Sequence, residues 1–168
     1  MPNHYQMLIV GVGKAGLSAA SQLLKKSSNI PIGIYKPSEK YYYQPAWTLA
    51  GAGIFDIIKT ERNKADFIPK NITWIKDAIT EFIPYSNSLK CKPGNSFSYD
   101  ILMVCSGIQI DWDRIEGLKE TLCKNNVSSN YSFEAASYTW EMIENFKGGT
   151  AVFTNPTSPV KCGGAPYK

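Results

Sequence analysis

A glycine pattern between two apolar segments limits this chain to very few folds. The pattern, G-V-G-K-A-G, occupies residues 11–16 and directly follows a short apolar run at 5–10. Residues 15–26 repeat leucine and alanine at helical spacing and end in two lysines, which complement the negative end of the helix dipole. A second apolar run follows at 30–35. We therefore predict a β-α-β unit, the setting in which G-x-G-x-x-G is typical of dinucleotide binding.

Each glycine of the pattern has a physical task in such a site. Gly11 allows the tight turn, Gly13 lets the backbone approach a pyrophosphate, and Gly16 allows close packing of the helix on the strand. The helix N-terminus, at Lys14 and Ala15, then faces the phosphates. The alternative is a turn of the same shape that only packs the helix and binds no phosphate.

The alternation of apolar runs with helical spacing predicts a three-layer α/β core. A small antiparallel insertion is expected at about 73–99, where short strand-like pieces surround a turn at 92–95. The expected elements are strands at 73–76, 78–83, 88–91, 101–104 and 151–154, and a helix at 137–146.

Composition narrows the possible partners. The chain has 168 residues and a net charge of +4, with its lysines scattered rather than in a block, so we expect no nucleic-acid binding. Four cysteines lie far apart and there is one histidine, which argues against a metal site of the zinc type and against a secreted disulfide framework.

No apolar run approaches the roughly 20 residues that span a bilayer. The N-terminus shows the pattern of neither a signal peptide nor a transit peptide.

The end of the second strand departs from the usual fingerprint. An acid is expected there to hold a ribose hydroxyl, but the residue is Lys36, with Glu39 three positions later. A lysine at this point is compatible with a 2′-phosphate and hence NADP, or with a side chain lying along the adenine ribose. Glu39 is a candidate substitute acceptor, and a solvated lysine that touches no ligand is the remaining interpretation.

Three other places have both a structural and a functional interpretation. The aromatic cluster at 43–47 either packs in a core or places Gln44 on a flat cofactor. Gly107 follows a buried strand, where a glycine lets the backbone come near a ligand, and Cys105 beside it is expected to be a buried small hydrophobe. Cys91 and Cys123 have polar sequence neighbours, and we assign them no role.

Cys162 is the candidate reactive thiol. It follows Lys161 and precedes two glycines, where a loop is expected to open toward a helix. A neighbouring cation and a helix N-terminus both favour the thiolate, the nucleophilic form of cysteine. The alternative is an incidental thiol, and no sequence spacing here reveals a partner for a disulfide.

Taken together, these motifs resemble the N-terminal part of a sulfide:quinone oxidoreductase of the mitochondrial, animal and fungal type. The blocks Q-P-A-W-T-L and P-V-K-C are far more specific than the glycine pattern. The stretches that carry the resemblance run in order through nearly the whole chain, at 11–17, 37–39, 43–53, 74–76, 106–109, 129–132 and 159–166.

The resemblance implies a glutathione-reductase-like flavoprotein with two interleaved dinucleotide-binding domains. Residues 1–150 would form the FAD-binding, Rossmann-like domain, and 151–168 would begin a second such domain that carries Cys162. By this resemblance FAD lies against the glycine loop, Lys36, Gln44 and the backbone near Ile79. Family members usually have glutamate where this chain has Lys36.

The resemblance also implies a reaction. Cys162 matches one of two redox cysteines: sulfide attacks their sulfur bridge and leaves a persulfide on the partner, and the thiolate released at Cys162 attacks the flavin. Electrons then pass through FAD to ubiquinone, and the sulfane sulfur goes to a small acceptor, a thiol or sulfite. The family acts at the mitochondrial inner membrane.

The family's chains are well over twice as long as this one. We therefore expect a truncated chain that does not turn over alone, with the partner cysteine, the quinone pocket and the membrane-associating region outside it. Two other interpretations stay open: a relative of type II NADH dehydrogenases or ferredoxin reductases, and a non-catalytic nucleotide-binding domain.

Overall fold

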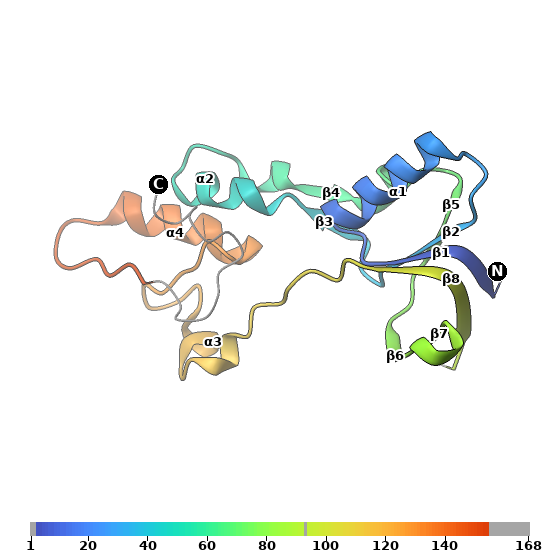
Figure 1. The fold of residues 1–168 in the computed structure, drawn as a ribbon. Coiled ribbons are helices and arrows are strands. Elements are labelled where there is room, and N and C mark those ends of the chain that lie inside the picture. Colours follow the sequence, from blue (N-terminus) through green and yellow to red (C-terminus); the bar gives the residue numbers. More distant parts are fainter. Residues whose placement is uncertain (1–2, 93, 155–168) are drawn as a thin grey trace.

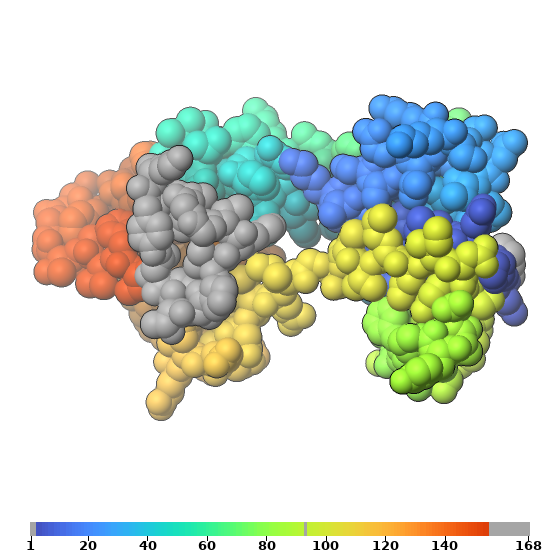
Figure 2. All heavy atoms as spheres, in the orientation of Figure 1, coloured from blue at the N-terminus to red at the C-terminus, as the bar shows by residue number. Residues whose placement is uncertain are grey.

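The computed structural model describes residues 3–92 and 94–154, and it places them in two lobes (Figure 1). One lobe is a β-sheet with helix α1, Lys14–Lys26, on its surface; the other holds helices α2, Trp47–Gly51, α3, Leu118–Thr121, and α4, Phe133–Asn145. The extended segment after the last strand and the short β3–β4 ribbon join the lobes, and Figure 2 shows how narrow these connections are. The glycine loop lies in the sheet lobe.

The main sheet has six strands in the order β5-β2-β1-β8-β7-β6. Its first four members, β5, β2, β1 and β8, pair in parallel, and β7 and β6 continue the sheet antiparallel. The strand bounds are His4–Val10 for β1, Ile32–Tyr35 for β2, Ile72–Ile75 for β5, Ile79–Ile83 for β6, Ser88–Cys91 for β7 and Ser96–Val104 for β8. The predicted β-α-β unit is therefore confirmed, with β1 and β2 in register from Met7 opposite Ile32.

The sheet separates two apolar clusters, which make the three layers. On one face Ile9, Val12 and Ile34 pack beneath α1, whose fully buried Ala20 lets the helix lie close. On the other face the curled β7 and β8 bring Leu89 and Phe97 against strand β1. The second outer layer is thus the antiparallel hairpin rather than a helix.

The antiparallel insertion is smaller than the sequence predicts. Residues 72–75 form β5, which lies parallel to β2 and belongs to the main sheet. Residues 96–99 begin β8, whose later part pairs in parallel with β1. Only β6, β7 and the first part of β8 are antiparallel, because the chain reaches the sheet edge after β5 and must fold back to supply β8 beside β1.

Aromatic side chains form the core of the helical lobe. The rings of Tyr42, Trp47 and Phe133 pack together, with ring centroids 4.8 to 6.3 Å apart. The indole nitrogen of the buried Trp47 donates to Thr60 Oγ1 at 3.1 Å, and that hydroxyl donates to the carbonyl of Ile57 at 2.7 Å. The other elements are strands β3, Lys40–Tyr42, and β4, Glu61–Asn63, and 3-10 turns at Gln44–Ala46, Ile57–Thr60, Lys64–Asp66, Pro84–Ser86 and Trp112–Arg114.

Two sequence predictions near the C-terminus change. Helix α4 begins at Phe133, four residues before the predicted start, because Ser132 caps it by accepting the N–H of Ala135. The strand predicted at 151–154 is wrong, since these residues have no regular structure. Val152 and Phe153 are 78% and 83% exposed, so no neighbouring strand of the described chain pairs with this apolar run. Cys162 and the rest of 155–168 lie outside the described residues.

Candidate dinucleotide-binding site

The turn after β1 has a backbone that only glycine tolerates. Gly11 has a φ of +112°, and a Cβ at this position would overlap the carbonyl oxygen of Cys105, which follows β8. Hydrogen bonds fix the turn from both sides: the N–H of Gly11 donates to Tyr35 at 3.0 Å, and that of Cys105 donates to Val10 at 2.7 Å. The carboxyl ends of β2, β1 and β8 therefore meet at this turn, which is the edge where α/β sheets bind ligands.

Gly16 and Gly13 differ in their surroundings, as the sequence predicts: one is closely packed and the other faces open space. A Cβ on Gly16 would overlap the carbonyl oxygen of Gly11, so α1 lies against the turn because Gly16 has no side chain. Gly13 is exposed, and a Cβ built on it would meet no described atom within 4 Å. Close packing at Gly16 and open space at Gly13 are what a bound pyrophosphate requires of this loop.

The N-terminus of α1 is electrostatically ready for an anion. Lys14 is the first residue of this 13-residue helix, Gly13 provides no capping side chain, and the first turn contains no acidic residue. Its unpaired N–H groups and the positive end of the dipole therefore face outward beside Lys14 and the exposed Ala15. The chain's own residues fit a dinucleotide phosphate here.

Lys36 lies where the fingerprint places the ribose contact, at the carboxyl end of β2. Its N–H donates to Ile75 at 3.2 Å, and its carbonyl accepts from the indole of Trp74 at 3.0 Å. Glu39, the candidate substitute acceptor, is exposed and pairs with Lys76 at 2.5 Å. The hydrogen bond and charge of Lys76 lower the pKa of Glu39.

Sequence reasoning missed Lys64, which lies beside this strand end. It is 3% exposed, and its ammonium donates to the carbonyl and hydroxyl oxygens of Ser38 at 2.8 and 3.1 Å. Burial, and then the charge of Lys36, lowers the pKa of Lys64 to about 8. The sequence places Lys64 in a polar segment 26 residues from Ser38, so no local pattern indicates its burial.

The remaining predicted residues are distributed over both lobes. Ile79 begins β6 and packs against the cluster that contains Tyr35 and Ile75, close to the end of β2. Gly107 lies three residues past β8 with a φ of +76°, in open space among the described atoms. Gln44 begins the 3-10 turn that leads into α2, and it belongs to the helical lobe. The structure brings the glycine loop, Lys36 and Ile79 to one region, whereas Gln44 lies beyond β3.

The structure buries part of the aromatic cluster at 43–47. Trp47 is buried in the core of the helical lobe, while Tyr43 is 45% exposed.

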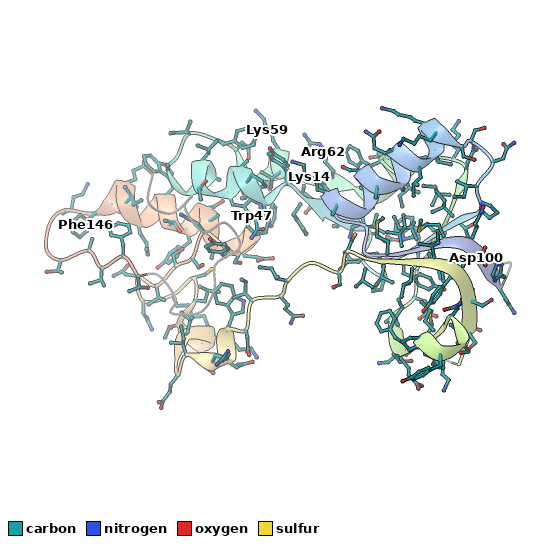
Figure 3. The ribbon with its side chains drawn as sticks, viewed as in Figure 1. Lys14, Trp47, Lys59, Arg62, Asp100 and Phe146 are labelled. Carbon is teal, nitrogen blue, oxygen red and sulfur yellow. The ribbon has the colours of Figure 1, made fainter. Side chains whose placement is uncertain are left out.

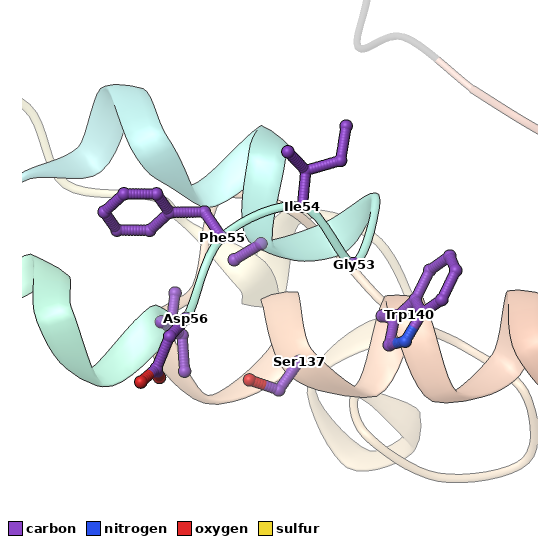
Figure 4. A pocket seen from close by; sticks show the side chains of 8 residues that line it. Gly53, Ile54, Phe55, Asp56, Ser137 and Trp140 are labelled. Carbon is purple, nitrogen blue, oxygen red and sulfur yellow. The ribbon is translucent and has the colours of Figure 1, made fainter.

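Gly53, with a φ of +74°, lies so close to the ring of Trp140 that a Cβ would overlap it (Figure 4). A cavity of about 340 Å³ opens here, lined by Ala50, Gly53, Ile54, Phe55, Asp56, Ile57, Ser137 and Trp140.

A second cavity lies on the outer side of α1. Its volume is about 350 Å³, and Lys14 at the helix start contributes to its wall. The rings of Tyr41 and Phe67, 5.8 Å apart, form the opposite side. Figure 3 shows Lys14, Lys59 and Arg62 near the junction of the two lobes.

Two cysteines differ from their predicted surroundings. Cys91, expected in polar surroundings, is 2% exposed in the cluster beneath the sheet. Burial, followed by the charge of Asp77, raises the pKa of its thiol. Cys105, expected to be buried, is half-buried, and its carbonyl oxygen lies against the Gly11 turn.

Comparison with known proteins agrees with this geometry. No protein-family model matches the sequence. The chain is 50% identical over 170 residues to the mitochondrial sulfide:quinone oxidoreductase of Dictyostelium discoideum, a match that covers 100% of this chain and 38% of that protein. The chain is homologous to mitochondrial sulfide:quinone oxidoreductases. The mouse protein of the same name is 38% identical over 166 residues, covering 99% of this chain and 37% of its own length.

The chain thus spans less than two-fifths of these relatives, namely their N-terminal part. The predicted resemblance to the N-terminal portion of sulfide:quinone oxidoreductases is confirmed. These relatives are enzymes by name, and that name also places them in the mitochondrion. Within the part of the chain that the structure describes, no helix has the length and apolarity to cross a membrane.

Solved structures match the fold. The sulfide:quinone oxidoreductase of the bacterium Aquifex aeolicus aligns with a TM-score of 0.66 at 21% identity, covering 85% of this chain and 32% of that one. The Plasmodium falciparum NDH2 structure in complex with NADH aligns with a TM-score of 0.60 at 14% identity, covering 81% and 28%. At these sequence identities the matches show similarity of fold alone. They confirm the predicted Rossmann-like fold class.

Proposed function

We propose that this chain is the FAD-binding part of a sulfide:quinone oxidoreductase. The observation that carries the proposal is the glycine loop, in which Gly16 is packed against Gly11 while Gly13 is left open at an uncapped helix N-terminus. Backbone N–H groups of α1 would hold the pyrophosphate of FAD, and the end of β2 would face its adenosine. The homology to sulfide:quinone oxidoreductases supports FAD as the dinucleotide.

In the complete reaction, sulfide is the electron donor and ubiquinone the acceptor, and bound FAD supplies the two-electron carrier between them. Cys162, which lies outside the described residues, would be one of two redox cysteines, with a thiolate favoured by Lys161. The sulfur atom would leave as a persulfide that passes to a small thiol or sulfite. The site of action would be the mitochondrial inner membrane. Because the chain spans less than two-fifths of its relatives, we propose that it does not turn over alone.

The cofactor proposal is tested by titrating the 168-residue chain with FAD and following flavin fluorescence. We expect saturable binding that Gly13→Asp abolishes, since the new carboxylate would occupy the place of a phosphate. Ser86→Asp adds the same charge on the exposed turn between β6 and β7 and should bind FAD like the unaltered chain. Equal binding by both variants, with circular dichroism showing that both are folded, would exclude this loop as the flavin site.

A relative of type II NADH dehydrogenases is the second candidate, supported by the NDH2 fold match. The two are separated in a chain extended to the length of the relatives. Cys162→Ser should abolish sulfide-dependent quinone reduction and leave FAD content unchanged. NADH-dependent quinone reduction that survives this substitution would favour the second candidate.

A further inference from the structure

The end of β2 differs from an ordinary dinucleotide site in its charge. We define the ribose corner as segment 36–39 together with Lys64, which contacts it. The inference below rests on the proposed dinucleotide binding and concerns how the adenosine ribose is recognised. A dinucleotide fold normally presents a carboxylate here, which accepts hydrogen bonds from the ribose hydroxyls.

The carboxylate of the ribose corner, Glu39, and that of Glu61 on the adjoining β4 are both already paired with lysines. Glu39 pairs with Lys76 at 2.5 Å, and Glu61 pairs with Lys40 at 2.5 Å. The ammonium of Lys76 also lies 4.6 Å above the ring of Trp74, which holds it near Glu39.

Hydrogen bonds from Lys64 hold segment 36–39 of the ribose corner in place. Its ammonium binds both oxygens of Ser38, and its backbone N–H donates to the carbonyl of Glu39 at 2.9 Å. In turn, the N–H groups of Phe67 and Ile68 donate to the carbonyl of Lys64 at 3.0 and 3.2 Å. One buried residue therefore joins segment 36–39 to the 3-10 turn at Lys64–Asp66.

Two positive charges then share the corner without a counter-ion. Among the described residues neither Lys36 nor Lys64 forms an ion pair, and Lys64 is buried. Repulsion between two ammonium groups disfavours a Lys36 side chain folded inward over Lys64. The backbone N–H and carbonyl of Lys36 are both engaged with β5, so its side chain is the group left to meet a ligand.

We propose that the ribose corner recognises adenosine with reversed polarity: the Lys36 ammonium donates to a ribose hydroxyl oxygen, and Lys64 is the positioning residue that directs Lys36 outward. A hydroxyl oxygen accepts from an ammonium as readily as a hydroxyl hydrogen donates to a carboxylate. The corner therefore still offers a hydrogen-bond partner to a ribose hydroxyl although position 36 is not an acid.

The same arrangement predicts how a glutamate at position 36, the usual residue there, would behave in this chain. A carboxylate at position 36 would lie beside the uncompensated Lys64 ammonium and pair with it. Lys36→Glu alone should therefore fail to restore ordinary ribose recognition. Lys36→Glu with Lys64→Met should succeed, because the carboxylate then has no cationic partner in the corner.

The test measures hydroxyl discrimination, defined as the ratio of the dissociation constants of 2′-deoxy-ADP or 3′-deoxy-ADP to that of ADP, by calorimetry on the 168-residue chain. We expect a ratio of about ten for one of the two analogues, since a hydrogen bond to a charged group is lost. Lys36→Met should bring the ratio to about one. Lys64→Met should lower it too, but should have no further effect when Lys36→Met is already present. The Lys36→Glu background separates the two roles of Lys64: loss of a purely structural contact would lower the ratio there too, whereas removal of its charge should raise it.

Ser38→Ala removes one acceptor of Lys64 and keeps its charge, so it gives the same test if Lys64→Met does not fold. It should lower the ratio, but less than Lys36→Met does, because the Lys64 ammonium stays in place with one acceptor fewer. A ratio near one in the unaltered chain, or an unchanged ratio in Lys36→Met, overturns the inference and leaves dinucleotide binding intact. Binding of 2′,5′-ADP a hundredfold tighter than ADP overturns it in favour of a phosphate site. Absence of ADP and FAD binding overturns both proposals.

Discussion

The carbonyl oxygen of Gly11 lies where the Cβ of any larger residue at position 16 would be. This contact sets the distance between α1 and the end of β1, and so it sets the height of the helix N-terminus above the turn. Gly13, between the two, touches no described atom in the same direction. Folding and ligand binding therefore depend on different glycines of one motif.

The first prediction separates these two tasks. Gly16→Ala should lower the free energy of unfolding by about 1–3 kcal/mol, because α1 must move away from the turn. Gly13→Ala should change it by less than about 0.5 kcal/mol, since its backbone conformation is ordinary and the space is open, but should weaken ADP binding. Urea unfolding and calorimetry provide the two measurements. Equal destabilisation by both substitutions would contradict the assignment.

The second prediction concerns the helical lobe. Thr60→Val removes the acceptor of the buried Trp47 indole N–H and the donor to the Ile57 carbonyl. A buried unsatisfied donor costs about 1–3 kcal/mol, and the loss should appear in urea unfolding followed by tryptophan fluorescence. Thr48→Val is the matched control, because Thr48 is exposed and its hydroxyl makes only a 3.4 Å contact with Pro45. A control variant that is equally unstable would mean that the lost hydroxyl, not the buried bond, is responsible.

The third prediction concerns Cys91. Burial beneath the sheet both raises its thiol pKa and excludes reagents. In a variant that keeps only this cysteine, reaction with an aromatic disulfide reagent should be at least about a hundredfold slower without urea than in urea. A variant that keeps only the half-buried Cys123 should show a much smaller difference. Fast reaction of folded Cys91 would show that the β7 layer opens readily.

Local sequence patterns predict most of the fold and the glycine loop at the centre of the candidate site. The β-α-β unit and the tasks of Gly11, Gly13 and Gly16 follow from residues within one short segment, and the structure confirms the turn and packing parts of that assignment. Burial of Cys91 could not be predicted, because it results from the curl of β7 over the opposite face of the sheet. The same holds for Lys64, whose contact with Ser38 exists only once the β3–β4 ribbon has formed.

The fourth prediction uses the buried ammonium of Lys64, whose pKa falls from 10.5 to about 8 on folding. Below about pH 8 the group is charged in both states, so it adds no pH dependence there. Between about pH 8 and 10.5 the unfolded chain binds more protons than the folded chain, and stability therefore rises with pH. The full rise is about 3 kcal/mol.

Other groups titrate in the same interval, so the quantity to measure is the difference in unfolding free energy between the unaltered chain and Lys64→Met. That difference should move in favour of the unaltered chain as the pH rises from 8 to 10.5. Lys70→Met, which removes an exposed lysine, should give a difference that stays flat. A flat difference for Lys64→Met as well would show that its ammonium is hydrated, and it would remove the like-charge repulsion on which the orientation of Lys36 depends.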